Sequence, residues 1–539
     1  MNDLASHMEP IYSRVVQGMD APLVSVECHI GPGSPATTIV GLPEGAVRES
    51  RDRVRAALKS SGFEYPQGRI VINLAPANLT KTGSVLDLPI ALSILRAHQL
   101  SGARSLSQYE WIGELGLSGE VRQTQGSLVC ALACRRANRT LVVPDGAQAE
   151  LAHLARIAAS AKDTTAEKAG AQDAEAQDAE AKDAEAKDAE AKIALVGSLR
   201  EAIALAQTGE LRPLPNTGPK RLEAFPGIYS DIIGQASAKR ALAIAAAGGH
   251  HLLMVGPPGS GKTMLARALA ELMPPLTNDE ALEVAAIYSC SGLNCPHERP
   301  FREPHHSTTS AALTGGGRTP TPGEVSLSHN GVLFLDELPH FKPSVLDNLR
   351  EPIESGRTTV SRVGYKVRYP CRFQLVAAMN SCPAGRTCSA QACRCTPEQV
   401  RRYQGRISGP LVDRIDLQVM VRPVPAAELS VANESTVDVG DLKARIERAH
   451  SRQLARQGVH NAQLSARAVT ALMQAADIAP PIQEALARQA LSARSLHKIW
   501  KVARTIADLE ARATINDQHL LQALGFRMLD WESGLGVGG

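Results

Sequence analysis

Residues 256–263 read Gly-Pro-Pro-Gly-Ser-Gly-Lys-Thr, the complete eight-residue pattern of a phosphate-binding P-loop. An apolar run that is typical of a buried strand ends at Val255, and residues 264–271 are rich in helix formers. Strand, glycine-rich loop and helix thus follow one another in the order that lets backbone N–H groups hold phosphates at a helix N-terminus. This segment predicts a nucleotide-binding domain of the α/β class.

A second segment supplies the other half of a hydrolytic site. Residues 332–337 read Val-Leu-Phe-Leu-Asp-Glu, a short apolar strand that ends in two carboxylates. Lys262 would neutralise the β- and γ-phosphates of ATP, while the Thr263 hydroxyl and the Asp336 carboxylate would hold Mg²⁺. Glu337 would orient and deprotonate the attacking water. We therefore predict ATP hydrolysis with Mg²⁺, and the predicted nucleotide-binding residues are Gly256, Pro257, Pro258, Gly259, Ser260, Gly261, Lys262, Thr263, Met264 and Asp336.

Length and composition narrow the class of protein. With 539 residues the chain is too long for one hydrophobic core, which suggests about three or four domains. It contains no apolar stretch of about eighteen residues, and its polar start lacks the features of a signal peptide. The ten cysteines are scattered except for one group, which fits a reducing compartment. We therefore expect a cytoplasmic protein without a membrane partner. A net charge of only +3 does not by itself predict a polyanionic partner, so binding of one would depend on local basic patches.

Changes in composition along the chain indicate domain boundaries. Residues 1–209 alternate short apolar runs with helical stretches, which predicts an α/β or α+β domain. At about residues 162–192 it contains a low-complexity insertion without large apolar side chains, and such a segment cannot bury a face. A proline-containing linker at 210–223 precedes the predicted ATPase core at 224–424. A mainly helical segment at 441–529 closes the chain.

Several longer motifs resemble one known family. Asp231-Ile-Ile-Gly-Gln-Ala-Ser-Ala-Lys-Arg-Ala-Leu precedes the P-loop, and Arg302-Glu-Pro-His-His-Ser, Pro322-Gly-Glu-Val-Ser-Leu-Ser-His-Asn-Gly and Ala378-Met-Asn follow it. Together they resemble the ComM (YifB) family of Mg-chelatase-like AAA+ ATPases over nearly the whole chain. The resemblance implies an N-terminal Lon-protease-like α+β domain, a central AAA+ P-loop ATPase domain and a C-terminal helical lid. It also implies a homo-hexameric DNA helicase, stabilised by nucleotide or DNA, that promotes branch migration in natural transformation and homologous recombination alongside recombinase-pathway partners.

An arginine beyond the nucleotide motifs bears on the assembly of the protein. Arg414, in Asp-Arg-Ile-Asp-Leu, resembles the arginine finger that stabilises charge on the γ-phosphate of a neighbouring subunit's nucleotide. A finger supplied to a neighbour requires an oligomer, most simply a closed ring. Without the resemblance, Arg414 would fit a structural ion pair with Asp413 or Asp416 equally well.

Two more polar residues take roles from the resemblance. Asn380 follows an apolar strand and resembles sensor 1, a side chain that helps to hold the hydrolytic water. Arg494, in Ser-Ala-Arg-Ser, resembles the sensor 2 arginine of the lid. Arg504 on the same helical stretch could also reach a phosphate, and we prefer Arg494. The predicted catalytic residues are Lys262, Glu337, Asn380, Arg414 and Arg494.

Residues 355–372 predict a basic β-hairpin. β-branched residues alternate around a turn at Gly364, and the segment comes directly before the strand that ends at Asn380. In the family that it resembles, a hairpin at this place projects into the central pore. Its cations would hold DNA phosphates without reading sequence, and its tyrosine would stack on a base. Composition alone favours an ordinary solvated hairpin. The predicted DNA contacts are Arg362, Tyr365, Lys366 and Arg368.

Two groups of side chains raise the question of a further metal. Four cysteines within a short polar loop suggest a structural Zn²⁺ held by thiolates. Ala384 stands where relatives carry one of the expected cysteines, so another cysteine of this chain must substitute for it. The candidate ligands are Cys382, Cys388, Cys393 and Cys395. His305 and His306 form a second candidate, which we rank below a structural role for the pair.

The first domain resembles the Lon-protease-like domain in the motifs Leu42-Pro-Glu-Gly and Asp87-Leu-Pro-Ile-Ala-Leu. Lon-type proteases use a serine that a lysine activates. Here Val85 stands at the family's serine position, Ser84 lies one place earlier, and the lysine of the dyad is equally missing. We therefore expect no peptidase activity, and a role in ring assembly or DNA engagement instead.

Three functions follow from these features. We favour a DNA helicase or translocase that couples ATP hydrolysis in a ring to strand movement. The alternative is a chelatase-type ATPase motor that works on a protein partner. An ATP-dependent protease is the least favoured of the three.

Overall fold

The computed structural model describes residues 9–98, 106–152, 154, 192–215, 227–296, 298–317, 320–362, 365–385, 393–424, 438–488 and 492–527. The predicted insertion, part of the predicted linker, Cys388 and the side chain of Tyr365 lie outside this description. The chain divides into two compact units. Unit 1 comprises Met1–Arg221, Thr277–His297 and Thr359–Tyr369, and unit 2 comprises Leu222–Leu276, Glu298–Thr358 and Pro370–Gly539.

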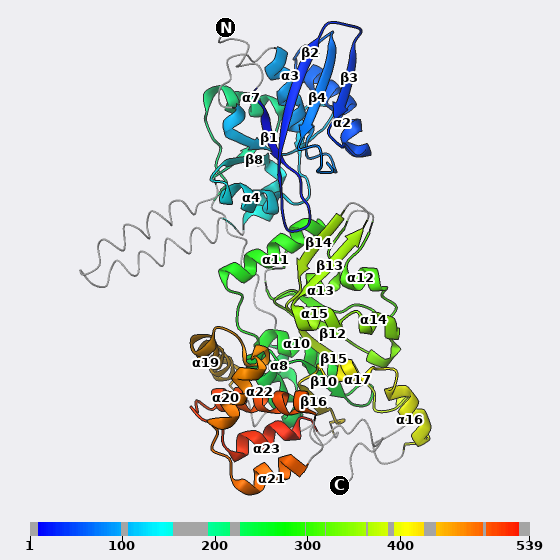
Figure 1. Ribbon diagram of the computed structural model, residues 1–539, viewed down its shortest axis with the longest axis vertical. Helices are drawn as coiled ribbons and strands as arrows, with labels where there is room; N and C mark the ends of the chain where they lie inside the picture. Colours follow the sequence, from blue (N-terminus) through cyan, green and yellow to red (C-terminus); the bar gives the residue numbers. More distant parts are fainter. Residues whose placement is uncertain are drawn as a thin grey trace, which may run out of the picture. The chain divides into compact units, whose positions relative to one another are not determined.

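A mixed β-sheet forms the centre of unit 1 (Figure 1). Among the described residues its strand order is β3-β4-β2-β1-β5-β8-β9. The pairs β1–β2 and β2–β4 are antiparallel, whereas the other neighbours are parallel. The strands are β1 (Ile11–Arg14), β2 (Leu23–Gly31), β3 (Ala36–Val40), β4 (Arg69–Ala75), β5 (Tyr109–Trp111), β8 (Thr140–Pro144) and β9 (Ile193–Val196).

Helices pack on this sheet through apolar faces that the sequence pattern dictates. In β4 the buried residues Ile70, Ile72 and Leu74 alternate with more exposed ones, as expected where one face of a strand is covered. Helix α3 buries nearly all of its residues. The helices are α2 (Gly45–Ser60), α3 (Asp87–His98), α4 (Ser127–Arg136) and α7 (Leu199–Thr208), and a short ladder joins β6 (Glu114–Leu115) to β7 (Val121–Arg122).

A helix from the middle of the chain belongs to unit 1. Helix α11 (Asn278–Ser291) begins at a capping box formed by Thr277 and Glu280. Its residues Ala285 and Ala286 lie in the main hydrophobic core of the unit. The thiol of Cys290 donates a hydrogen bond of 2.8 Å to the carbonyl oxygen of Gly18. The helix is therefore integrated into the N-terminal unit although it follows the P-loop in sequence.

The predicted hairpin also contributes to unit 1. It consists of β13 (Arg357–Arg362) and β14 (Tyr365–Pro370), which together form a two-stranded sheet. Val360, Val367 and Tyr369 are buried in a small cluster against Met19. Gly18, with φ of +67°, lies so close that a Cβ atom there would be 2.0 Å from Cγ1 of Val367. One face of the hairpin is thus a packing surface.

Unit 2 is built on a parallel sheet. In the described residues its strand order is β11-β12-β15-β10-β16, with parallel pairing throughout. The strands are β10 (Leu252–Val255), β11 (Phe301–Arg302), β12 (Val332–Leu335), β15 (Gln374–Met379) and β16 (Leu417–Met420). All four residues of β10 and β12, and all six of β15, are buried, as expected for a parallel sheet covered on both faces.

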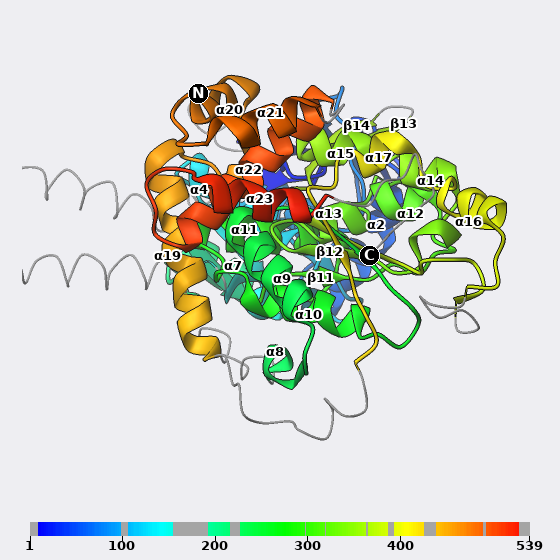
Figure 2. The ribbon, with the colours of Figure 1, turned by 90° about the horizontal axis from the view of Figure 1, so that it is seen from below.

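Two hydrophobic cores lie on opposite faces of this sheet. In β10, Leu252 and Met254 belong to one core, and Leu253 and Val255 belong to the other. The first core includes residues of α9 (Ala236–Gly248), α10 (Lys262–Leu272) and the C-terminal helices, which gather together in Figure 2. The second core includes residues of α14 (Pro343–Asp347) and α17 (Gly409–Val412). Unit 2 therefore has the three-layered α/β architecture that the P-loop predicts.

Short helices connect the strands, and longer ones close the chain. The connecting helices are α8 (Ile228–Asp231), α12 (Ser310–Thr314), α13 (Glu324–Leu327), α14 (Pro343–Asp347), α15 (Arg350–Ser355), α16 (Pro397–Gln404) and α17 (Gly409–Val412). The C-terminal helices are α19 (Val439–Gln457), α20 (Ala466–Gln474), α21 (Pro480–Arg488), α22 (Ala493–Leu509) and α23 (Asp517–Gly525).

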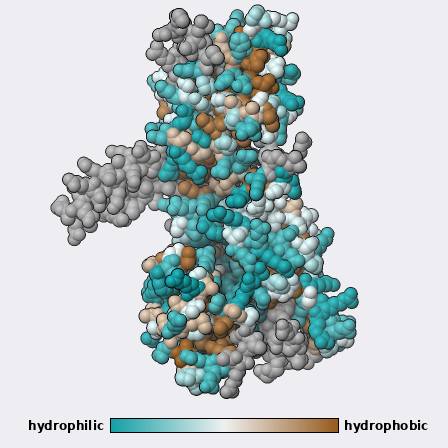
Figure 3. All heavy atoms as spheres, viewed as in Figure 1, coloured by the Kyte–Doolittle hydropathy of each residue, from teal (hydrophilic) through white to brown (hydrophobic). Residues whose placement is uncertain are grey.

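The face of the molecule in Figure 3 is mostly hydrophilic with small apolar areas. Within the described residues, no helix is long and apolar enough to cross a membrane.

Candidate nucleotide-hydrolysis site

The P-loop connects β10 to α10, and its conformation depends on glycine. Gly259 and Gly261 have φ angles of +79° and +88°, where L side chains are strained. At Gly256 a Cβ atom would lie 2.2 Å from the carbonyl oxygen of Val421. Helix α10 begins directly after this loop, at Lys262. The N-terminal N–H groups of α10 are therefore presented at the end of the parallel sheet, where phosphates bind in folds of this class.

The ammonium group of Lys262 lies inside this loop. It donates hydrogen bonds of 2.9 Å to the carbonyl oxygens of Gly256 and Pro257, and a contact of 3.4 Å reaches Oδ1 of Asn380. Burial lowers the pKa of Lys262, and the carboxylates of Asp336 and Glu337 oppose that shift. The hydrogen-bond partners of this ammonium group are neutral oxygens, so none of these hydrogen bonds neutralises its positive charge. This arrangement suits the phosphates of a nucleotide.

The predicted Mg²⁺ ligands lie next to each other. The hydroxyl of Thr263, on the first turn of α10, donates to Oδ2 of Asp336 at 3.4 Å. Asp336 follows β12, and its Oδ1 accepts a 2.8 Å hydrogen bond from the backbone N–H of Glu337. Glu337 has φ of +50°, a left-handed conformation that is uncommon for a residue other than glycine. A hydroxyl and a carboxylate at this spacing fit the oxygen preference of Mg²⁺.

Asn380 occupies the central place at this edge of the sheet. It follows β15, and β15 lies between β10, which leads to the P-loop, and β12, which leads to Asp336. Parallel strands present their carboxyl ends at the same edge, so residues that are distant in sequence converge there. The contact between Asn380 and Lys262 is the direct result.

Two histidines that the sequence did not link to catalysis lie beside Glu337. Nδ1 of His306 is 3.6 Å from Oε2 of Glu337, and Nδ1 of His340 is 3.7 Å from the same oxygen. The ring of His306 also lies 4.1 Å from that of His305, centroid to centroid. His305 itself contacts Ser307 at 2.8 Å. The pair considered as a metal site therefore has one member beside the predicted base. Only His340 lies near Glu337 in sequence, so no local pattern signals the contact of His306.

The two arginines predicted from the resemblance meet on one carboxylate. Arg414 donates to Oε1 of Glu354 and, at 2.6 Å, to the carbonyl oxygen of Pro410. Arg494, on α22, lies 3.5 Å from the same Oε1. Glu354 lies on α15 and is half exposed. Spacing in the sequence does not reveal this junction, because its three members come from separate parts of unit 2.

Asp416, an alternative ion-pair partner of Arg414, and Arg504, an alternative to Arg494, both have other partners. Asp416 pairs at 2.9 Å with Lys498, and although burial alone would raise the pKa of Asp416, Lys498 and His250 hold it well below its usual value. Arg504 is buried and donates at 2.9 Å to Asp508. In the described residues, no ion pair joins Arg414 to Asp413 or Asp416. Arg504 thus has a structural environment, whereas the side chain of Arg494 is more than half exposed.

The hairpin separates its cations from its apolar residues. Arg362, Lys366 and Arg368 are exposed, whereas Val360 and Val367 are buried. The strand position of Tyr365 is described, but its side chain is not. Lys366 and Arg368 alternate with the buried Val367 and Tyr369, so they lie on the face of β14 away from the apolar cluster. Arg362 follows Val360 by two residues and is exposed at the end of β13.

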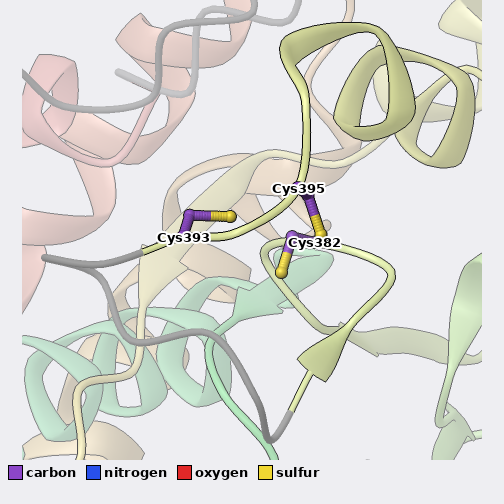
Figure 4. A group of neighbouring side chains, drawn as sticks. All are labelled: Cys382, Cys393 and Cys395. Carbon is purple, nitrogen blue, oxygen red and sulfur yellow. The ribbon is translucent and has the colours of Figure 1, made fainter.

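Three of the four candidate zinc ligands come together. The Sγ atoms of Cys382, Cys393 and Cys395 all lie within 4.8 Å of one another, and Figure 4 shows the side chains gathered between two segments of the loop. Cys382 is buried, Cys395 is partly buried and Cys393 is exposed. Among the described residues this is the only group of three such ligands. The fourth candidate, Cys388, lies outside the described residues.

The N-terminal unit shows no serine–lysine pair among its described hydrogen bonds. The hydroxyl of Ser84 donates to Glu114, and the ammonium of Lys81 donates to the carbonyl oxygen of Pro76. Val85 is buried in the core. The absence of peptidase activity stays a prediction.

Comparison with known proteins assigns the family. The family described as magnesium chelatase, subunit ChlI, matches residues 228–429, and related families match residues 26–147 and 437–527. The protein YifB of Salmonella typhimurium is 41% identical over 96% of this chain and 97% of its own length. The competence protein ComM of Haemophilus influenzae is 40% identical over 96% of this chain and 97% of its own length. The magnesium-chelatase 38 kDa subunit of Cereibacter sphaeroides is 29% identical over 37% of this chain and 59% of its own. The chain therefore belongs to the ComM (YifB) family of Mg-chelatase-like AAA+ ATPases.

Proposed function

We propose that this protein is a hexameric ATPase that moves along DNA and promotes branch migration during natural transformation and homologous recombination. The observation that carries the proposal is the hairpin β13–β14 with its exposed cations. Its apolar side packs in unit 1, while its cations Arg362, Lys366 and Arg368 remain exposed directly before the strand that leads to Asn380. Exposed cations bind phosphates regardless of base sequence, as a motor that moves along DNA requires. The name of the relative ComM, a competence protein, supports the same process.

ATP and Mg²⁺ are the cofactors of the proposed cycle. The P-loop would hold the phosphates, and Thr263 and Asp336 would hold the metal. Glu337 would act as base toward the attacking water, and Asn380 would help to position it. A structural Zn²⁺ on the cysteine group is a separate proposal, because thiolates favour zinc and not magnesium.

The arrangement of the arginines supports a ring. Arg414 and Arg494 share Glu354, and none of the described hydrogen bonds or ion pairs connects either of them to the P-loop of the same chain. We propose that Arg414 completes the site of a neighbouring subunit, as an arginine finger does. Arg494 would act as the sensor 2 arginine, and helices α19 to α23 would form the lid. A closed ring gives every subunit such a neighbour.

The N-terminal unit has an accessory role in this proposal. Its resemblance to Lon-type domains concerns the fold, since Ser84 contacts Glu114 and Val85 is buried. Assembly of the ring in the cytoplasm and engagement of DNA are the roles proposed for it.

Unwinding of a four-way DNA junction by the purified protein tests the proposal. We expect ATP-dependent unwinding and faster ATP hydrolysis with forked DNA, and we expect Lys262→Ala to abolish both. Replacing Arg362, Lys366 and Arg368 by alanine should weaken DNA binding and make its salt dependence shallower, by roughly 0.7 to 0.9 in the log–log slope for each lost phosphate contact.

The matched control removes the same charge from another exposed place. Arg401, Arg402 and Arg406, on and after α16, are exposed. Their replacement by alanine should leave the salt slope unchanged. Equal effects of the two triple variants would contradict a specific role for the hairpin. Stimulation by a protein partner and not by DNA would favour the chelatase-type motor instead.

A further inference from the structure

We propose that Cys382, Cys393 and Cys395 bind one structural Zn²⁺ ion, and that this ion positions the loop that carries Asn380 against the P-loop. Neither part follows from the family matches. The metal content is independent of the proposed DNA function, whereas the positioning role rests on the proposed role of Asn380 in ATP hydrolysis.

The geometry of the three thiols fits a zinc site. Zn–S bonds of about 2.3 Å in a tetrahedron place sulfur atoms about 3.8 Å apart. The three Sγ atoms lie within 4.8 Å of one another, so small side-chain rotations would bring them to that spacing. They come from both ends of the loop, since Cys382 follows β15 and the other two precede α16 (Figure 4). One ion would therefore join two segments.

The sequence of this loop contains no large apolar side chain. Residues 380–396 contain no Val, Ile, Leu, Met, Phe, Tyr or Trp, so their side chains cannot form a hydrophobic core. Metal binding contributes folding free energy where apolar burial does not suffice. Soft thiolate ligands select zinc over magnesium and calcium, which prefer oxygen. Two ligands spaced Cys-x-Cys with a distant third are compatible with a tetrahedral site that takes one more ligand.

The same loop contacts the hydrolytic site. Cys382 begins a turn that follows Asn380, and the backbone N–H of Gly385 in this turn donates at 3.3 Å to the carbonyl oxygen of Cys382. A Cβ atom at Gly385 would lie 3.2 Å from Cγ of Pro258 in the P-loop and 3.6 Å from Nδ2 of Asn380. Asn380 in turn accepts from Lys262. Fixing Cys382 through a metal would therefore fix the turn whose Gly385 lies against Asn380 and Pro258.

Metal analysis of the purified full-length protein tests the site. We expect about one zinc per chain, released when a mercurial reagent titrates the thiols. Substitution by Co²⁺ should give the strong charge-transfer absorption of thiolate ligands. Cys393→Ser combined with Cys395→Ser should remove the metal, and Cys28→Ser, a partly exposed cysteine of β2, should retain it. Because Cys393 is exposed, its replacement alone should leave the fold intact by circular dichroism, even if Cys395 were needed for stability.

Several results would overturn the metal site. Zinc far below one per chain in the wild type, zinc that persists in the double variant, or cysteines recovered as a disulfide without metal would each do so.

A kinetic comparison tests the positioning role. Removing zinc should lower kcat for ATP hydrolysis about tenfold while the Kd for ATP changes by less than about twofold. Asn380→Ala should have a similar effect, and zinc removal from Asn380→Ala should add little, because both changes act through one side chain. Unchanged kcat after complete loss of zinc would overturn this role and leave the metal site standing. A loss of junction unwinding with normal ATP hydrolysis would concern the DNA function alone.

Discussion

Single side chains define the chemistry of the site, and their partners come from distant parts of the chain. Lys262, Thr263, Asp336 and Asn380 form one set of contacts at the carboxyl edge of the parallel sheet. The P-loop pattern and the resemblance predicted these residues, because each lies in a recognisable local motif. His306 lies in one of those motifs without any local sign that it contacts Glu337.

The contact between His306 and Glu337 leads to a kinetic prediction. His306 lies 3.6 Å from the carboxylate that would activate water, so it should position that carboxylate. We expect His306→Asn to lower kcat about tenfold with little change in the Kd for ATP, as measured by steady-state hydrolysis and nucleotide titration. His29→Asn, at an exposed position of β2 in the other unit, is the control. Equal kcat in the wild type and His306→Asn would contradict the prediction.

A desolvated histidine should make stability depend on pH. Burial lowers the pKa of His251 to about 4, and its Nδ1 accepts a 3.0 Å hydrogen bond from the backbone N–H of Leu375. The unfolded chain, with a histidine pKa of about 6.5, binds more protons between pH 6.5 and 4. The free energy of unfolding should therefore fall as pH is lowered through this range, by at most about 3 kcal/mol.

Urea unfolding at several pH values measures this effect. His251→Gln keeps a hydrogen-bond acceptor without a titrating group and is the matched variant. We expect its stability to change less between pH 6.5 and 4 than that of the wild type. Parallel pH profiles of the two proteins would show that other groups, such as Asp416, account for the dependence.

For helices and strands, the local sequence pattern predicts the element but not the residues that it packs against. The alternation in residues 355–372 predicted the hairpin, and the structure confirms β13 and β14 in that segment. Alternation did not show that Val360, Val367 and Tyr369 would pack against Met19, because a pattern marks an apolar face without naming what covers it. The same holds for α11, whose Ala285 and Ala286 join the core of the N-terminal unit.

This packing predicts a local effect of mutation. Val367→Ala removes buried methyl groups from the cluster and should cost about 1 to 3 kcal/mol of local stability. We expect faster amide hydrogen exchange in β13 and β14, measured by mass spectrometry, with normal basal ATP hydrolysis. Thr359→Ala, at an exposed position of the same hairpin, is the control. Exchange that is equal in the two variants would mean that the cluster does not stabilise the hairpin.

The whole molecule contains one P-loop site and, in our proposal, completes it with a residue of another copy. Arg414 and Arg494 are held on Glu354, and the described contacts do not connect them to Lys262 of their own chain. Only assembly would bring Arg414 to a phosphate. The sequence predicted this division through the family resemblance and not through spacing.

Rings assembled from two inactive variants test whether Arg414 acts at the site of a neighbouring subunit. Lys262→Ala and Arg414→Ala should each be nearly inactive alone. A mixture in equal amounts should recover up to about one quarter of the wild-type ATPase rate, because one interface in four then joins an intact P-loop to an intact arginine. Arg504 does not serve as a control position in this experiment, since it is buried against Asp508. A mixture as inactive as its components would contradict an arginine supplied between subunits.

Short contiguous motifs were enough to predict the α/β class of the ATPase unit, its nucleotide residues and its family, because their backbone chemistry is local. Which distant side chains meet became known only from the three-dimensional structure. It placed His306 beside Glu337, Glu354 between two arginines, and α11 within the core of the N-terminal unit. Such contacts join residues far apart in the chain, and the order of strands and the packing of apolar faces, which no short motif encodes, bring them together.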